Sequence, residues 1–125
     1  MKKILLVSLV VVFGAFTQQS IIDEMVNALK TGNSSKLAGY FDNTVSITLP
    51  DKSDVYSRNQ AEVVMRDFFT NNNVKDFGIV HKGNNSGSEF FIGNLQTKNG
   101  TYRTTIFLKN KNDKQLLQEI KMESK

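Results

Sequence analysis

The chain has 125 residues, 39% of them hydrophobic, with 16 basic and 12 acidic side chains and no cysteine. This length fits a single domain built around one core. The net charge of only +4 argues against a strongly basic nucleic-acid-binding protein, and the lack of cysteine excludes disulfide bonds.

Residues 1–17 have a composition of their own. Lys2 and Lys3 precede an apolar run, residues 4–13, that only Ser8 interrupts. A positive segment followed by a short apolar run is typical of a secretory signal peptide, and the run is shorter than the ~20 apolar residues of a transmembrane helix. We therefore expect residues 1–17 to be a signal peptide. The protein should be exported, either periplasmic or secreted, with no membrane span after processing.

The cleavage site is less clearly marked. Small or polar residues follow the apolar run, and cleavage after Gly14 or after Thr17 fits them. The mature chain should then begin between Ala15 and Ser20. Neither position matches the preferred pattern of small residues well, which leaves a retained N-terminal anchor as the alternative.

The chain after the leader begins with two helical patterns. Apolar side chains recur every three or four positions over residues 21–29, where Ser20 can cap the helix and Gly32 can end it. A second, shorter helix is predicted over residues 35–41, capped by the preceding serine. Phe41 lies on its apolar face and is expected in the core.

A strand pair and a third helix are predicted next. Alternation of apolar and polar residues indicates a strand over residues 45–49, which Pro50 ends, and residues 54–56 can form a short return strand. Residues 57–60 have the pattern of a capping box, and the helix that follows should end at residues 71–73.

The pattern from Val74 onward is that of strands only. Three turn signals divide it into four segments, residues 74–82, 88–96, 101–109 and 115–122. Asn99-Gly100 is typical of a type I′ hairpin turn, in which both central residues have positive φ. Apolar residues lie on both faces of the middle strands. Helices can cover one face, so we expect a second subunit to cover the other in a homodimer.

The order of these elements and three stretches of sequence resemble the nuclear transport factor 2-like superfamily. The stretches are residues 25–33 (MVNALKTGN), 37–42 (LAGYFD) and 66–69 (RDFF). The first two are similar to the opening pattern of that superfamily, in which a helix ends at Gly-Asp or Gly-Asn and a Leu-x-x-x-Phe helix precedes the first strand. The resemblance covers residues 20–122.

This resemblance implies an α+β fold in which three N-terminal helices pack on a curved, mostly antiparallel sheet, a cone-shaped α+β roll. It implies a single domain over residues 18–125. The nearest relatives are expected among small exported bacterial proteins of unassigned function.

Membership of this superfamily does not bring a reaction with it, because the fold carries many functions. Its ketosteroid-isomerase-like branch uses an aspartate before the proline that ends the first strand as base. A tyrosine of the first helix and an acid on a late strand donate hydrogen bonds. The corresponding residues here are Leu49, Met25 and, within a residue or two, Thr105. Leucine and methionine cannot fill these roles, so we expect no isomerase chemistry and name no catalytic residue.

His81 is the only histidine, on a strand where Phe77 and Ile79 are expected to share its face. If that face lines the cone, His81 can act as a general base or bind a ligand; otherwise it is a strand-end histidine bonded to a neighbour. One histidine without cysteine cannot hold zinc, and Asp51 with Asp54 fits a solvated turn better than a calcium site. We expect no metal and no cofactor.

Three lysines, Lys109, Lys111 and Lys114, gather at one predicted hairpin. Asp113 lies among them, and no aromatic residue is interleaved there to stack on bases. We interpret them as a solvated hairpin and expect no nucleic-acid partner.

The patterns together favour an exported, non-catalytic binding or interaction domain. As a binding module it would hold a small apolar or amphipathic ligand in the mouth of the cone. The residues expected to line that mouth are Met25, Leu49, Tyr56, Phe68 and His81. As an interaction protein it would dimerise, or bind a cell-surface partner, through the outer face of its sheet. The alternative is an enzyme of the same fold that uses His81 and Arg103 in a polar cavity.

Overall fold

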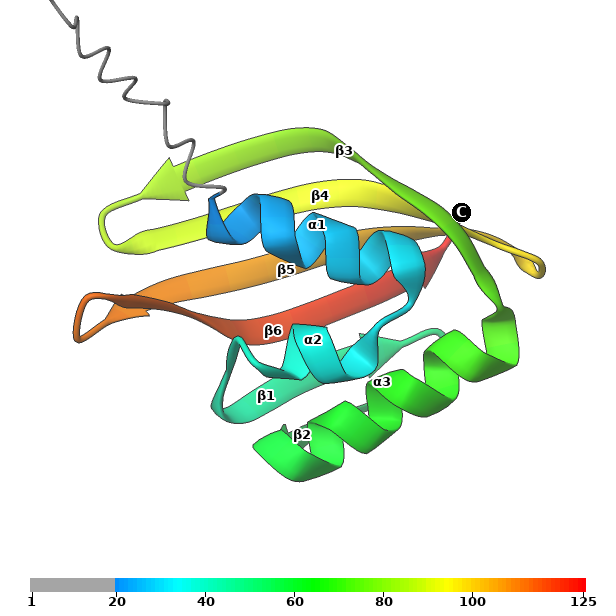
Figure 1. Ribbon diagram of the computed structural model, residues 1–125, viewed down its shortest axis with the longest axis horizontal. Coiled ribbons are helices and arrows are strands. Elements are labelled where there is room, and N and C mark those ends of the chain that lie inside the picture. Colours follow the sequence, from blue (N-terminus) through cyan, green and yellow to red (C-terminus); the bar gives the residue numbers. More distant parts are fainter. Residues whose placement is uncertain (1–19) are drawn as a thin grey trace, which may run out of the picture.

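The computed structural model describes residues 20–125, so the expected signal peptide, residues 1–17, lies outside the described residues. The described part contains three helices and six strands (Figure 1). In chain order these are α1 (Ile21–Thr31), α2 (Ser34–Ala38), β1 (Phe41–Leu49), β2 (Lys52–Ser57), α3 (Arg58–Asn72), β3 (Val74–Asn85), β4 (Ser88–Thr97), β5 (Gly100–Lys111) and β6 (Lys114–Ser124).

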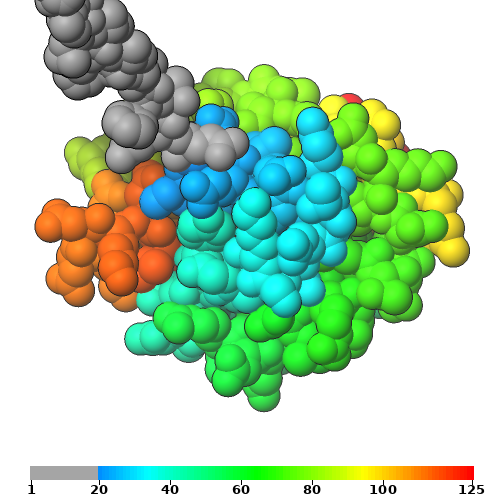
Figure 2. Space-filling model, in the orientation of Figure 1, coloured from blue at the N-terminus to red at the C-terminus, as the bar shows by residue number. Residues whose placement is uncertain are grey.

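The six strands form one curved sheet in the order β2-β1-β6-β5-β4-β3. β1 and β6 run parallel, and every other pair of neighbours runs antiparallel. The helices lie on one face of this sheet, where α1 packs against β3 and α3 packs against β1 and α2. Figure 2 shows their side chains over the centre of that face. The predicted α+β class with a mostly antiparallel sheet is confirmed.

The predicted caps of α1 and α3 are also confirmed. The Ser20 hydroxyl accepts a hydrogen bond from the Asp23 N–H at 3.1 Å. Gly32 ends α1 at φ 64°, a left-handed conformation that favours glycine. Ser57 and Gln60 form the reciprocal bonds of a capping box at the start of α3. Such contacts join residues that are close in sequence, and a sequence pattern can therefore predict them.

The prediction for the second helix is wrong at both ends. α2 covers only Ser34–Ala38, and its N-cap is Asn33, whose side chain accepts from the backbone N–H three residues on at 3.0 Å. Phe41 belongs to β1 and pairs with Leu117 of β6. The Leu117 N–H also donates to the Tyr40 carbonyl at 2.7 Å. A contact between residues far apart in sequence thus overrides the local helical pattern.

The turn between β4 and β5 differs from the predicted type I′ turn. Its central residues are Lys98 and Asn99, neither of which has positive φ, and the φ of 121° falls on Gly100. The Lys98 N–H donates to the Asn72 carbonyl at the end of α3 at 3.0 Å, so docking to the helix helps to set the turn. Both central residues of the β5–β6 turn, 112 and 113, do have positive φ, as a type I′ turn requires.

The core lies between the helices and the inner face of the sheet. The most deeply buried sheet residues on this face include Phe77, Phe91, Leu95, Ile106 and Ile120. The helices contribute Met25, Leu29, Met65 and Phe69. Phe41 is 1% exposed, which confirms it as a core residue. The opposite face, here called the outer face, carries Phe90, Ile92 and Phe107 on the middle strands.

Candidate functional site

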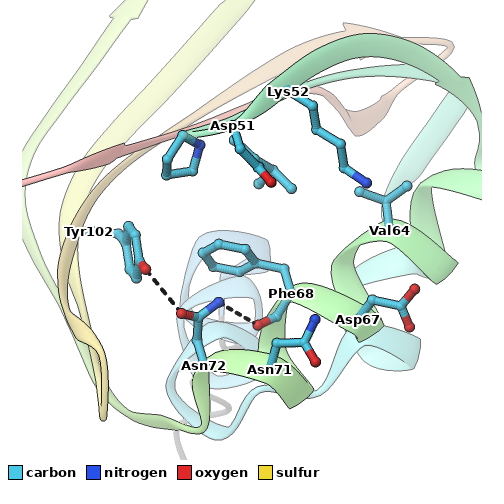
Figure 3. A pocket seen from close by; sticks show the side chains of 10 residues that line it. Asp51, Lys52, Val64, Asp67, Phe68, Asn71, Asn72 and Tyr102 are labelled. Carbon is cyan, nitrogen blue, oxygen red and sulfur yellow. Dashed lines mark hydrogen bonds between the residues drawn. The ribbon is translucent and has the colours of Figure 1, made fainter.

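A pocket of about 300 Å³ opens where the β1–β2 turn faces the C-terminal half of α3 (Figure 3). We call it the mouth pocket. Residues 49–52 line it from the end of β1 and the turn, and Tyr102 lines it from β5. From α3 it is lined by Val64, Asp67, Phe68, Asn71 and Asn72. Pro50 favours the turn at the end of β1 because its φ is fixed and it lacks an N–H for a strand ladder.

The floor of the mouth pocket is apolar. Leu49 and Phe68 are 7% and 8% exposed, and Val64 is half-buried. The ring of Phe68 meets that of Tyr102 edge to face, with centroids 5.1 Å apart and planes at 70°. These side chains can contact the apolar part of a small molecule.

Asn72 holds one wall of the pocket in place. Its amide nitrogen donates to the Phe68 carbonyl at 2.8 Å. Its amide oxygen accepts from the Tyr102 hydroxyl and from the Asn99 amide, both at 3.0 Å. Asn72 is 8% exposed, and these bonds satisfy the side chain inside the fold. The end of α3, β5 and the β4–β5 turn are thereby joined at the pocket.

The rim of the pocket is polar and exposed. Asp51 and Lys52 come from the β1–β2 turn and the start of β2, and Asp67 and Asn71 come from α3. Figure 3 shows the Lys52 side chain extending from the turn toward α3. The Asp67 carboxylate lies 3.8 Å from the exposed Arg66 guanidinium. The pocket therefore combines an apolar floor with charges of both signs at its edge.

Comparison with known protein families shows which family this chain is in. Residues 22–123 match the family model described as a domain of unknown function, DUF4783. The chain belongs to the DUF4783 family. No curated protein matches it significantly.

Solved structures of the DUF4783 family are similar over most of the domain. A family protein from Bacteroides uniformis has 30% sequence identity and a TM-score of 0.82, covering 85% of this chain and 98% of its own. One from Bacteroides ovatus has 31% identity and a TM-score of 0.79, covering 82% and 93%. Outside those two family proteins, a domain of unknown function with a cystatin-like fold from Nostoc punctiforme is 10% identical, with a TM-score of 0.65. That match covers 82% of this chain and 71% of the Nostoc chain.

These likenesses identify the fold of this DUF4783 domain. Designs of the nuclear transport factor 2-like type are also among the similar structures, one of them 20% identical with a TM-score of 0.64 over 82% of this chain and 92% of its own. The fold that the sequence resemblance implied is confirmed, and the function of the DUF4783 family is unassigned.

The residues that the sequence analysis expected to share a site are distributed over several places in this DUF4783 domain. Leu49 and Phe68 do meet in the mouth pocket. Met25 is fully buried in the core and is not a lining residue. Tyr56 lines a separate groove of about 410 Å³ between β2 and α3, which shares Val64 with the mouth pocket.

His81 lies on the outer face of β3, away from the helices. The β3–β4 register shifts between Ile79, which pairs with Gly93, and His81, which pairs with Ile92. This irregularity interrupts the alternation of side chains, so Phe77 is buried against the helices while His81 is exposed. The expected common face of these residues is therefore wrong. The His81 ring lies 5.7 Å from that of Phe90 on the outer face.

Thr105, the approximate counterpart of the late-strand acid, also faces away from the pocket. It pairs with Ile92 and with Lys121 on the outer face, and it is 8% exposed. The neighbouring Thr104 and Ile106 are the residues of this part of β5 that face the helices. Neither carries an acidic group.

Sequence reasoning missed Asn72 and Tyr102 as pocket residues. The run Asn71-Asn72-Asn73 indicated only the end of a helix. The partners of Asn72 lie 27 and 30 positions later in the chain, and no local pattern marks contacts at that distance.

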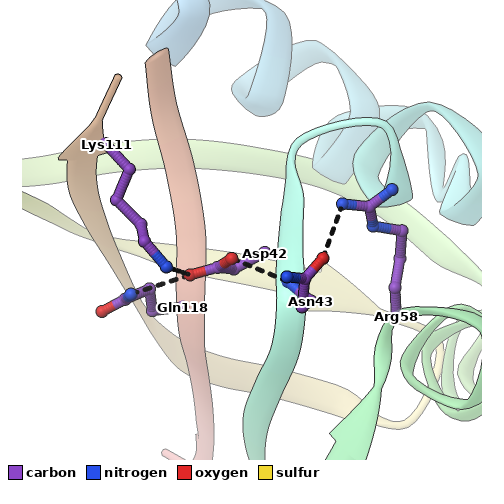
Figure 4. A network of polar contacts seen from close by, with 5 residues as sticks. All are labelled: Asp42, Asn43, Arg58, Lys111 and Gln118. Atoms are coloured by element: carbon purple, nitrogen blue, oxygen red, sulfur yellow. Dashed lines mark hydrogen bonds and ion pairs between the residues drawn. The ribbon is translucent and has the colours of Figure 1, made fainter. Parts of the chain in front are cut away.

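A second polar cluster lies where β1 meets β6 (Figure 4). Asp42 Oδ2 accepts from Gln118 Nε2 at 2.9 Å and from Lys111 Nζ at 3.1 Å. The Asn43 N–H donates to Asp42 Oδ1 at 2.7 Å. The hydrogen bond from Gln118, with those from Asn43 and Lys111, holds the pKa of Asp42 below its usual value against the effect of burial. This seam coincides with the register shift between Phe41 and Ser46, so we interpret the cluster as structural.

Tyr40 and Glu24 make a third polar contact. The Tyr40 hydroxyl donates to the Glu24 carboxylate of α1. Burial, helped by this carboxylate, raises the pKa of Tyr40 to about 12. The pair ties α1 to the segment that leads into β1, which is also a structural role.

Among residues 20–125, no group of three or more histidine, cysteine, aspartate or glutamate side chains has the arrangement of a metal site. No helix in the same range is long and apolar enough to span a membrane.

Proposed function

We propose that this domain binds a small amphipathic molecule in the mouth pocket and does not itself catalyse a reaction. The observation that carries the proposal is the combination of a buried apolar floor, Leu49 and Phe68, with an exposed polar rim in a depression of about 300 Å³. Small-molecule sites are typically concave and mostly apolar with a few orienting polar groups, and their volumes start near ~300 Å³. A small ligand therefore suits the pocket better than a lipid with long chains.

The residue before Pro50 supports a binding role over catalysis. Leu49 occupies the position where the isomerase-like branch has its base, and its side chain is part of the pocket floor. A leucine there adds apolar surface but cannot take up a proton. The same position that would be catalytic in a related enzyme thus favours binding of an apolar group.

The first prediction is that filling the pocket removes binding. Asn71 is an exposed rim residue near the end of α3, and Asn71→Trp should place an indole across the mouth. With 3-phenylpropan-1-ol as an uncharged amphipathic probe, the wild type should show saturable shifts of backbone amide resonances around the pocket in ¹⁵N NMR titrations. Asn71→Trp should reduce the affinity at least about tenfold, because the added ring occupies the probe's volume.

The matched control is Thr70→Trp, on the exposed surface one residue earlier and outside the lining. It should bind the probe as the wild type does. Saturable shifts elsewhere, no shifts at the pocket, or equal binding by Asn71→Trp would overturn the proposed function.

We further propose that the protein is exported after removal of its leader. Lys2, Lys3 and the apolar run of residues 4–13 support this. Sequencing the N-terminus of the mature protein from its own host should give a start between Ala15 and Ser20. An intact Met1 on a membrane-bound product would contradict the proposal.

A second candidate function is self-association through the outer face of the sheet. Phe107 is 39% exposed there, and its ring lies 6.1 Å from that of Phe90. Charged residues of both signs lie beside them on the same face. In the pairing of β5 with β6, Arg103 is opposite Glu123, Thr105 is opposite Lys121, and Phe107 is opposite Glu119. An apolar centre flanked by charges of both signs can complement a second copy of itself.

The test of this second candidate is the oligomeric state. Sedimentation velocity at micromolar concentration should show a dimer for the wild type and a monomer for Phe107→Glu, because a buried unpaired carboxylate is costly. Val63→Glu, at a 42% exposed position on α3, is the control and should stay dimeric. A monomeric wild type would refute self-association.

A further inference from the structure

We propose that the mouth pocket selects a small zwitterion with an apolar side group, such as an α-amino acid whose side chain is apolar. The ammonium group of the ligand would lie at Asp51, its carboxylate at Lys52, and its side group on Leu49 and Phe68. This inference rests on the proposed function, since it names the class of ligand for the same pocket.

Two charges of opposite sign at neighbouring positions carry the inference. Asp51 and Lys52 are consecutive residues at the β1–β2 turn, both line the pocket, and both are exposed. Neither belongs to any ion pair among residues 20–125. Figure 3 shows them on the same side of the pocket, opposite α3. Both charges are therefore available to a ligand that enters over the floor.

The other charged residue of the rim, Asp67, comes from α3, across the pocket from Asp51 and Lys52. It lies 3.8 Å from Arg66. Opposite the turn, the Asn71 amide and the Tyr102 hydroxyl oxygen offer neutral hydrogen-bonding groups. On the turn side of the pocket, a ligand therefore meets one negative and one positive charge at consecutive residues.

A ligand that carries an ammonium and a carboxylate group on the same carbon suits Asp51 and Lys52 better than a ligand with a single charge. An anion attracted by Lys52 would also approach the Asp51 carboxylate, and a cation attracted by Asp51 would approach the Lys52 ammonium. A zwitterion can place each of its charges by the opposite one and gain at both. The volume of about 300 Å³ with an apolar floor accommodates one aliphatic or aromatic side group.

The test compares three probes that share a phenyl group on a short chain and differ in which charged groups they carry. L-Phenylalanine carries both charges, 3-phenylpropanoate lacks the ammonium, and 2-phenylethylamine lacks the carboxylate. In ¹⁵N NMR titrations at neutral pH, L-phenylalanine should bind about three- to fivefold more tightly than either partner probe, the range expected for exposed ion pairs.

Two variants assign the charges. Lys52→Gln should lower the affinity for L-phenylalanine and for 3-phenylpropanoate about three- to fivefold. The affinity for 2-phenylethylamine should stay the same or rise slightly. Asp51→Asn should lower the affinity for L-phenylalanine and for 2-phenylethylamine and leave the affinity for 3-phenylpropanoate unchanged. Lys36→Gln, an exposed substitution on α2 outside the pocket, controls for the loss of one positive charge and should change none of them.

The failure of this inference can be told apart from that of the proposed function. If 3-phenylpropan-1-ol binds in the mouth pocket but L-phenylalanine has no advantage over its singly charged partners, the zwitterion class is wrong and the pocket stands. The same conclusion follows if each of the two variants lowers the affinity for all three probes equally. If no probe, charged or neutral, shifts the pocket resonances, both proposals are refuted.

Discussion

Replacing Phe41 with alanine is expected to lower the free energy of unfolding by about 3–5 kcal/mol. The side chain is 1% exposed, and its backbone begins the β1 strand beside Leu117 of β6. Truncation leaves a cavity where the parallel strand pair meets the helices. Because small domains have only ~5–15 kcal/mol of stability, a large part of the total would be lost.

Urea denaturation followed by circular dichroism measures this effect. The control is Val63→Ala, at a 42% exposed position of α3, which should change stability by no more than about 0.5 kcal/mol. A Phe41→Ala variant within about 1 kcal/mol of the wild type would mean that the site collapses around the smaller residue. It would then not be the packed core position described above.

Replacing Asp42 with asparagine is expected to cost about 1.5–3 kcal/mol at neutral pH, the usual range for hydrogen bonds to a charged group. The side chain of Asp42 is 9% exposed and accepts bonds from Lys111 and Gln118. Asparagine keeps the shape but removes the charge, and its amide can place an N–H donor against these two donors. The β1–β6 seam around Ser46 should loosen as a result.

The same substitution should flatten the response of stability to acid. The folded-state pKa of Asp42 lies below its usual value of 3.8, so its contribution is fully present above about pH 5, where the carboxyl is ionised in the unfolded chain as well. The contribution is lost as the pH falls through the folded-state pKa. Wild-type stability should therefore fall below about pH 4 more steeply than that of Asp42→Asn.

Urea midpoints at pH 7, 4 and 3 test both statements. Asp76→Asn is the control, because the Asp76 carboxylate is 57% exposed and lies 3.8 Å from Lys30 in a surface ion pair. It should cost little at any pH. Parallel acid responses of Asp42→Asn and the wild type would show that the Asp42 cluster does not contribute in the way proposed.

The candidate site could be predicted in part. Leu49 could be placed at the pocket because it precedes Pro50, which ends the first strand, and Phe68 because it lies near the end of the third helix. Met25 has the same apolar character but is fully buried in the core and does not line the pocket. Apolar character indicates burial but does not tell a floor residue from a core residue.

The polar half of the pocket could not be predicted. Asn72 gains its role from the Tyr102 hydroxyl and the Asn99 amide, which reach it only when β5 and the β4–β5 turn dock on α3. In the sequence, Asn72 is one of three consecutive asparagines, all of which suit a helix end. Hydrogen bonds between distant residues depend on positions that only the folded chain defines.

The sequence by itself determined the features that depend on near neighbours: the caps at Ser20, Gly32 and Ser57, the alternation of the strands and the order of elements that identifies the fold. Each is stabilised by bonds within a few residues or by a simple period of apolar side chains. The tertiary structure alone decided that Phe41 joins β1, because β6 supplies the hydrogen bond that the helical pattern could not anticipate. It also decided that His81 lies on the outer face, because the irregular β3–β4 pairing reverses the alternation there.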